Sequence, residues 1–146
     1  MHFAPTLKYA ELTEKIIGVF FSVYNELGHG FLESVYEEAF EIALTEADIG
    51  VRRQVPIKVW FRGKSVGDFK ADMLVDEKVL LELKAARAID VAYERQLLNY
   101  LRATDLEIGL LLNFGVKPEF RRFAFENRRK LIRVDPRESA ASEGCA

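Results

Sequence analysis

Residues 79–86 (VLLELKAA) constrain the fold more than any other segment, because they are apolar on both faces apart from Glu82 and Lys84. A strand that is buried on both faces lies in the middle of a sheet covered from both sides. Glu82 and Lys84 are two residues apart, so on a strand their side chains leave the same face. An unpaired charge is expensive to bury. These two residues therefore need charged partners or a metal ion.

Hydrophobic periodicity predicts the other elements. Apolar residues recur at three- and four-residue spacing in three segments, which predicts helices at residues 12–27, 31–47 and 88–103. Strand patterns occupy five segments, namely residues 51–61, 66–75, 79–86, 107–114 and 120–134, the last as a strand or a short hairpin. The order predicts an α+β, or mixed α/β, fold with an antiparallel meander and one crossover helix.

Length and composition predict a single domain. The chain has 146 residues and no glycine-, serine- or proline-rich linker, so we expect one domain over residues 1–134 and a disordered tail over residues 135–146. No apolar run reaches the roughly 18 residues of a membrane helix, and no signal peptide is evident, so we expect a cytoplasmic protein without membrane contact. The net charge of −2 argues against the broad basic surface of a non-specific nucleic-acid binder.

A partner for Glu82 is available on the preceding strand. If a three-residue loop joins the two strands, Val75 pairs with Val79 and Asp72 lies directly opposite Glu82. A two-residue loop would instead put Asp72 on the other face of the sheet. Two close carboxylates repel each other unless a cation lies between them, and oxygen ligands select Mg²⁺ or Mn²⁺ rather than Zn²⁺. Without this context, an E-x-K on a strand would commonly be no more than its solvent-exposed face.

Several motifs together resemble the PD-(D/E)xK nuclease superfamily, whose fold is the restriction-endonuclease-like αβββαβ core. An aspartate in KADMLV, a hairpin and the E-x-K of LLELKA resemble its catalytic core. Residues 30–36 (GFLESVY) resemble the signature of the GxxExxY protein family, whose pattern residues 12–123 follow. Gln96 and Tyr100 in RQLLNYLRAT are similar to the Q-x-x-x-Y motif of the exonuclease-related branch. The resemblance implies that core with an extra N-terminal helix and a C-terminal strand.

The resemblance also implies a Mg²⁺-dependent nuclease, with Mn²⁺ as a substitute, that cleaves phosphodiester bonds in DNA more than in RNA. Asp72, Glu82 and the backbone carbonyl of Leu83 would hold the metal, with Glu33 as a third carboxylate. Lys84 would stabilise the negative charge of the transition state. Glu33 has an equally good alternative as a helix start, since Gly30 is an acceptable N-cap three residues earlier.

Other candidates would contact the substrate. Tyr36, one turn after Glu33, could bond to that carboxylate or to a phosphate. Gln96 would position the nucleophilic water or Lys84, and Tyr100 a phosphate oxygen; packing against the sheet is the alternative for both. A basic cluster comprises Arg121, Arg122 and residues 128–130. It is either a phosphate-binding surface or, slightly favoured, an edge strand kept soluble by charge.

A rival interpretation is a non-catalytic, nuclease-like binding module that acts through protein partners. The complete set of Asp72, Glu82, Lys84 and Gln96 favours an enzyme. The negative net charge and the lack of a second, DNA-gripping domain favour the module, or an enzyme that works as a homodimer or with a targeting partner.

Overall fold

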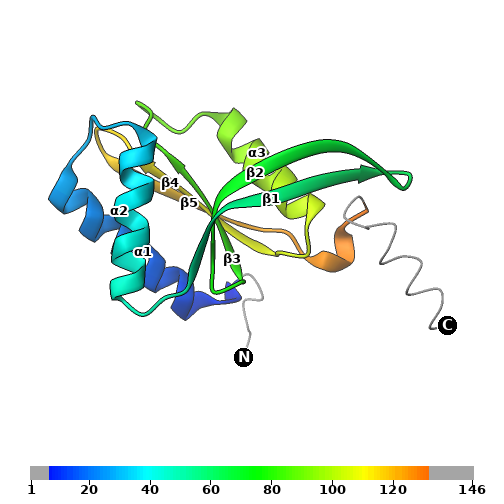
Figure 1. Ribbon diagram of the computed structural model, residues 1–146, viewed down its shortest axis with the longest axis horizontal. Helices are drawn as coiled ribbons and strands as arrows, with labels where there is room; N and C mark the ends of the chain where they lie inside the picture. Colours follow the sequence, from blue (N-terminus) through cyan, green and yellow to red (C-terminus); the bar gives the residue numbers. More distant parts are fainter. Residues whose placement is uncertain (1–6, 132–146) are drawn as a thin grey trace.

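The computed structural model describes residues 7–131 (Figure 1). The elements are α1 (Ala10–Leu27), α2 (Glu33–Glu46), β1 (Val51–Phe61), β2 (Lys64–Val75), β3 (Val79–Lys84), α3 (Val91–Ala103), β4 (Ile108–Phe114), β5 (Pro118–Ala124) and a 3₁₀ helix, Asn127–Arg129. The predicted tail, residues 135–146, and the end of the predicted 120–134 segment lie outside the described residues. Within the part that is described, this segment forms one strand followed by the 3₁₀ turn.

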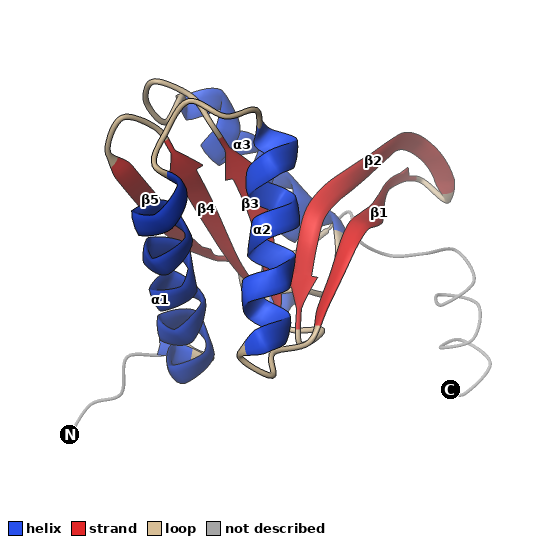
Figure 2. Ribbon diagram, turned by 60° about the vertical axis from the view of Figure 1, so that its left-hand side comes forward, coloured by secondary structure: helices blue, strands red, loops and turns tan. Residues whose placement is uncertain are grey.

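The five strands form one sheet in the order β1-β2-β3-β4-β5. Only β3 and β4 are parallel, and α3 is the crossover between them. Helices α1 and α2 cover one face of the sheet and α3 covers the other (Figure 2). This arrangement confirms the predicted α+β fold with a restriction-endonuclease-like core, an additional N-terminal helix and a C-terminal strand.

Two hydrophobic layers hold the sheet between the helices. The layer beneath α1 and α2 centres on Phe114, whose ring lies 4.9 Å from that of Phe20 and stacks at 4.3 Å on that of Tyr36. The opposite layer joins Leu97 of α3 to Leu80 and Leu111. Strands β3 and β4 contribute to both layers, which confirms that the apolar segment around Glu82 is a central strand.

The β1–β2 hairpin changes face part of the way along its length. Val51 packs on the α1–α2 side, whereas Val55 and Ile57 pack on the α3 side. The change occurs at Gln54 of β1, whose φ of 53° is left-handed, and at Asp72 of β2 opposite it. These two residues do not pair in the ladder between the strands. Beyond this point the hairpin curves away from the sheet and projects past the helices (Figure 1). The buried residues of β1 therefore do not share one face along residues 51–61.

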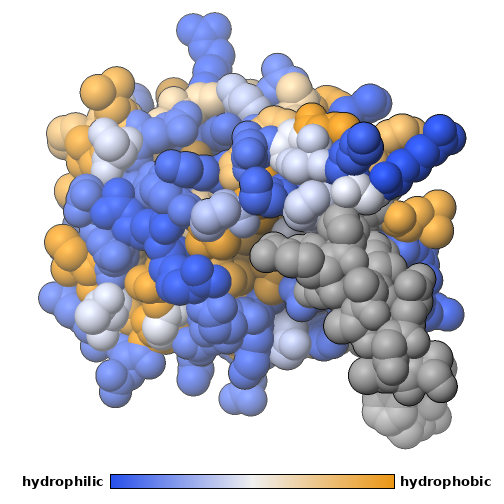
Figure 3. Space-filling model, turned by 45° about the vertical axis from the view of Figure 1, so that its right-hand side comes forward, coloured by the Kyte–Doolittle hydropathy of each residue, from blue (hydrophilic) through white to orange (hydrophobic). Residues whose placement is uncertain are grey.

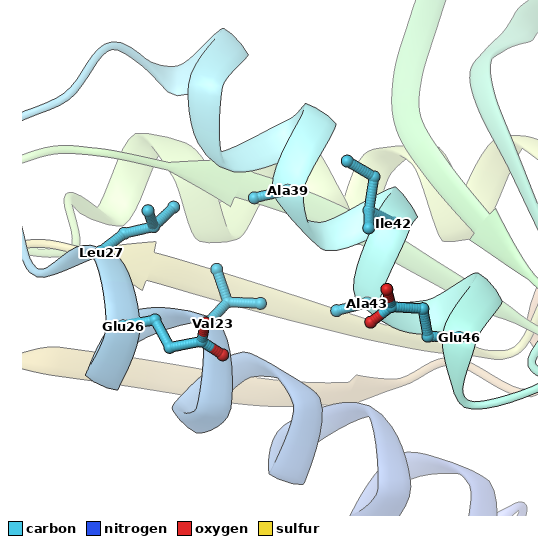
Figure 4. A pocket seen from close by; sticks show the side chains of 7 residues that line it. All are labelled: Val23, Glu26, Leu27, Ala39, Ile42, Ala43 and Glu46. Atoms are coloured by element: carbon cyan, nitrogen blue, oxygen red, sulfur yellow. The ribbon is translucent and has the colours of Figure 1, made fainter.

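The outer surface combines polar residues with small apolar areas. The face in Figure 3 is mostly hydrophilic, with hydrophobic residues in separate patches. Between α1 and α2 lies a hollow of about 260 Å³ (Figure 4), lined by Val23, Glu26, Leu27, Ala39, Ile42, Ala43 and Glu46. None of these is a predicted site residue. Within residues 7–131, no helix has both the length and the apolar character required to cross a membrane.

Candidate functional site

The register between β2 and β3 decides whether the two predicted carboxylates meet. Val75 pairs with Val79 and Met73 with Leu81, with a three-residue turn at residues 76–78 between the strands. Asp76 and Glu77 adopt left-handed φ values of 50° and 56° in that turn. The three-residue loop is confirmed, and the same register places Asp72 opposite Glu82.

The ladder between the two strands stops just before this pair, and side chains replace it. The Asp72 backbone N–H donates a hydrogen bond of 2.8 Å to Glu82 Oε2, and the Leu83 N–H donates one of 2.7 Å to Asp72 Oδ2. Each carboxylate thus reaches across to the other strand's backbone. Within residues 7–131, no hydrogen bond involves the second oxygen of either carboxylate. Both oxygens therefore remain available to a ligand.

Burial makes the ionised pair costly. Glu82 is only 3% exposed, and burial, followed by the negative charge of Asp72, raises the pKa of Glu82 to about 8. Burial also raises the pKa of Asp72 to about 6, despite its hydrogen bond from Leu83. The pair therefore favours any cation that can replace its protons.

Lys84 supplies positive charge on the same side of the sheet. Its ammonium lies 4.7 Å from the ring centroid of Tyr93 on α3, so the side chain leaves the α3 face. Its charge acts to lower the pKa of both Asp72 and Glu82. No ion pair between Lys84 and either carboxylate occurs in the described part of the chain. The ammonium is thus near the pair without being bound to it.

Helix α3 brings Gln96 and Tyr100 to this side of the sheet. The helix starts at Asp90, whose carboxylate accepts a hydrogen bond of 2.8 Å from the Ala92 N–H. Tyr100 is buried, and its pKa is raised by burial and then by the negative charges of Glu82 and Asp72. Gln96, one turn before Tyr100 on the same helix, opposes that rise in the pKa of Tyr100. The charges of both carboxylates therefore act on the Tyr100 hydroxyl, and Gln96 lies next to Tyr100.

Glu33 lies near the pair but does not complete a set of three carboxylates. It is the exposed first residue of α2, and its charge contributes to the raised pKa of both Asp72 and Glu82. Across residues 7–131, no three His, Cys, Asp or Glu side chains gather as a metal-binding group. Asp72 and Glu82 converge without Glu33, whose role as a third ligand stays a prediction. Gly30 is also not the N-cap, because Leu32 occupies that position.

Tyr36 has a packing role, which corrects its predicted contact with a phosphate. The side chain is fully buried, and its hydroxyl donates a hydrogen bond of 2.6 Å to the Gly28 carbonyl. The same hydroxyl accepts a bond of 3.3 Å from the Phe31 N–H. Tyr36 thus fixes the α1–α2 loop, where Gly28 and Gly30 have φ values of 69° and 109° that favour glycine.

The predicted basic cluster is divided between several places. Arg121 and Arg122 lie on edge strand β5 and leave opposite faces. Arg121 approaches Glu94 of α3 at 3.6 Å, whereas Arg122 donates a bond of 2.7 Å to the Lys8 carbonyl and has a pKa lowered by burial. Of the two, only Arg121 therefore shares a side of the sheet with the carboxylates. Residues 128–130 follow β5 in the 3₁₀ turn rather than adjoining either arginine along the strand.

Sequence reasoning missed a buried ion network behind Asp72. Glu37 of α2 accepts hydrogen bonds of 3.0 Å from Arg53 Nε and 2.9 Å from Gln54 Nε2. Its charge also contributes to the raised pKa of Asp72. The network ties the β1–β2 hairpin to α2 at Gln54, where the buried side chains of the hairpin change from one side of the sheet to the other. The available signal was the spacing of four between Glu33 and Glu37, which puts both on one side of the helix.

Asn113 was also missed, and it fixes the end of β3. It is fully buried on β4, opposite Lys84 in the parallel register. Its side chain accepts a bond of 2.9 Å from the Ala86 N–H and donates one of 3.0 Å to the Ala86 carbonyl. An asparagine inside the otherwise apolar strand IGLLLNF was the signal for such a bridge.

The donor atoms at the pair fit a hard divalent cation. Because N–H and C=O of one residue in a strand point to the same side, the Leu83 carbonyl faces the gap into which its N–H donates. Two carboxylates and one carbonyl are oxygen ligands of the kind that Mg²⁺ and Mn²⁺ accept, and water completes such sites. The raised pKa of both carboxyl groups agrees with a site that gains by holding positive charge.

Comparisons with known proteins concern the family and the fold of this chain. The sequence profile of the PD-(D/E)XK nuclease superfamily matches residues 10–123. The fold is similar to that in "Crystal structure of SSO0001", with a TM-score of 0.52 and 16% identity over 64% of this chain. This chain spans 50% of that one, and the likeness concerns the fold alone. No curated protein matches. The profile covers most of the chain, and the chain therefore belongs to the PD-(D/E)XK nuclease superfamily.

Proposed function

We propose that this protein is a divalent-metal-dependent nuclease that cleaves phosphodiester bonds, in DNA more than in RNA. Members of the superfamily are generally nucleases and usually use divalent metals. The observation that carries the proposal is the convergence of Asp72 and Glu82 in the gap between β2 and β3, beside Lys84. The narrower resemblance to the GxxExxY family stays a prediction.

Asp72, Glu82 and the Leu83 carbonyl would hold the cation, Mg²⁺ or Mn²⁺. When bound, the cation would polarise a phosphate oxygen and lower the pKa of a water nucleophile. The two carboxylates contribute more than ligand atoms, because their hydrogen bonds to the backbone N–H groups of Leu83 and Asp72 fix the width of the gap. This rigidity keeps the ligand atoms in place before the substrate arrives.

Lys84, Gln96 and Tyr100 would act on the substrate. The Lys84 ammonium is not bound to either carboxylate, so it can stabilise the negative charge that develops on the phosphate. The raised pKa of Tyr100 keeps its hydroxyl protonated, as a hydrogen-bond donor to a phosphate oxygen requires. Gln96, next to Tyr100 on α3, would position the nucleophilic water or Lys84. Arg121 on the same side of the sheet would contact a further phosphate.

The non-catalytic alternative has one specific observation in its favour. Each carboxylate already bonds to the backbone of the opposite strand, so Asp72 and Glu82 would be useful to the fold without any catalysis. Such a module would act through a targeting partner or a second copy of itself. Lys84 separates the two functions, because no hydrogen bond or ion pair in the described residues depends on its ammonium.

Lys84→Ala tests the proposal, with Lys15→Ala, an exposed lysine of α1, as the matched control. We expect Lys84→Ala to lower the release of labelled nucleotides by orders of magnitude, with little change in melting temperature or in its rise with Mn²⁺. The assay uses single- and double-stranded DNA and RNA with Mg²⁺, Mn²⁺ or chelator. A wild type that cleaves none of these with either metal would reject the enzyme and leave the binding module.

A further inference from the structure

A groove lies between the distal half of the β1–β2 hairpin and α3. The hairpin contributes Val59, Val66 and Phe69, and α3 contributes Arg95, Gln96 and Tyr100. Its volume of about 540 Å³ is within the range of small-molecule sites in proteins. The groove exists because the hairpin changes face at Gln54 and then curves over α3 (Figure 1).

Phe69 presents an open aromatic surface in this groove. Its side chain is 47% exposed, and its ring centroid lies 5.9 Å from that of Tyr100. The ring rests over Gly67, where an added Cβ would lie 2.7 Å from the ring carbon Cε2. The absence of a side chain at Gly67 thus makes room for the ring. A half-exposed ring of fixed position is the kind of surface on which an unpaired base stacks.

The groove adjoins the carboxylate pair. Tyr100 and Gln96 line it, and on the same helix the ring centroid of Tyr93 lies 4.7 Å from the ammonium of Lys84, which leaves the same face of β3 as Glu82. A phosphate held at the pair would therefore place its nucleoside at the entrance to the groove. Arg95 lies on the groove's α3 side with an exposed side chain, and it forms no ion pair with any residue from 7 to 131. Its guanidinium can receive the next phosphate of a strand.

Aromatic and apolar walls together with a cation match a nucleotide better than a purely apolar ligand. In a duplex the faces of each base are covered by its neighbours, so only an unpaired base can lay its face against Phe69. Building on the proposed nuclease function, we propose that this groove binds an unpaired nucleobase next to the scissile phosphate. The substrate is then single-stranded nucleic acid or a frayed end.

The test measures binding separately from cleavage. Fluorescence anisotropy in chelator follows labelled single-stranded DNA, single-stranded RNA and blunt duplex DNA, on a Glu82→Gln background in which one proposed metal ligand is replaced. We expect single strands to bind more tightly than duplex, and Phe69→Ala to weaken single-strand binding by roughly 5- to 150-fold. Phe69→Trp should keep the affinity, and Gly67→Ala, which displaces the ring, should reduce it. Phe61→Ala is the control, an exposed aromatic of the same hairpin that does not line the groove.

The outcomes separate this inference from the proposed function. The proposed base binding in the groove is overturned if single strand and duplex bind with equal affinity. It is also overturned if a Phe69→Ala variant folds and binds like its parent. In both cases the nuclease function is judged separately, from cleavage by the wild type. If the wild type cleaves nothing and the Phe69→Ala substitution abolishes single-strand binding, the proposed base binding in the groove stands and the nuclease function is rejected. Absence of any oligonucleotide binding, together with a wild type that cleaves nothing, rejects both. The DNA and RNA arms identify the sugar that the groove accepts.

Discussion

Glu82→Gln should stabilise the metal-free protein at neutral pH. Burial raises the pKa of Glu82 from an ordinary 4.5 to about 8, so the folded protein at pH 7 holds a proton that the unfolded chain has released. Stability is therefore highest below about pH 4.5 for this group and falls as the pH rises toward 8. Each pKa unit corresponds to about 1.4 kcal/mol, so the loss at pH 7 approaches about 3 kcal/mol.

Glutamine removes that loss because it carries no charge at any of these pH values. Its amide oxygen can still accept the hydrogen bond from the Asp72 N–H, which is now 2.8 Å from Glu82 Oε2. The free energy of unfolding in chelator at pH 7 should rise by up to about 3 kcal/mol, a melting-temperature increase of roughly 10 °C. The same variant should lose cleavage and most of the stabilisation by Mn²⁺.

Urea denaturation from pH 5 to pH 9, in chelator and with Mn²⁺, measures both effects. Glu77→Gln is the control in the neighbouring turn, because this exposed carboxylate is ion-paired to Arg52 and its pKa is lowered. That variant should lose rather than gain stability. If Glu82→Gln is less stable than the wild type at every pH, the reasoning from a buried, repelled carboxylate is refuted.

Three further predictions concern other residues. Mn²⁺ should raise the melting temperature more at pH 8 than at pH 6, because the protons of the two carboxyl groups must leave before the metal binds. Asp72→Asn should reduce this rise. Equal rises at both pH values would contradict the metal site. Tyr36→Phe should lower the free energy of unfolding by about 1–2 kcal/mol and leave cleavage unchanged, whereas a loss of cleavage without a loss of stability would return Tyr36 to the substrate site. Asn113→Ala should cost about 2 kcal/mol or more in chemical denaturation, since Ala86 loses partners for its N–H and carbonyl; an unchanged midpoint would show that the bridge contributes nothing.

The fold and the carboxylate pair were predictable because both depend on short-range patterns. The change from helical to alternating periodicity gave the order of the elements. The sequence left the loop between these strands open at two or three residues, and the three-residue loop that the structure has gives the register that places Asp72 opposite Glu82. A one-residue error would have moved Asp72 to the other face. Lys84 followed from Glu82 by the same period of two.

The misplaced residues depended on contacts that motif spacing does not record. The direction of Tyr36 is set by Phe114 and by the Gly28 carbonyl, which come from other elements. The left-handed φ of Gln54 turns the buried side chains of the hairpin to the other side of the sheet, and a glutamine in the sequence does not predict that conformation. The separation of Arg121 from Arg122 was predictable, because adjacent residues of a strand leave opposite faces.

The hydrogen bonds that the carboxylates make to the backbone have a consequence for how related sequences can diverge. A descendant that no longer cleaves nucleic acid still needs hydrogen-bond acceptors at positions 72 and 82, because two strand N–H groups depend on them. No such requirement holds at position 84. Selection on folding alone would retain an acceptor oxygen at both positions, from a carboxylate or an amide, after activity had gone, while the amine at position 84 drifts. Among relatives of this chain, a lysine at position 84 should therefore report activity better than the mere presence of an acceptor at positions 72 and 82.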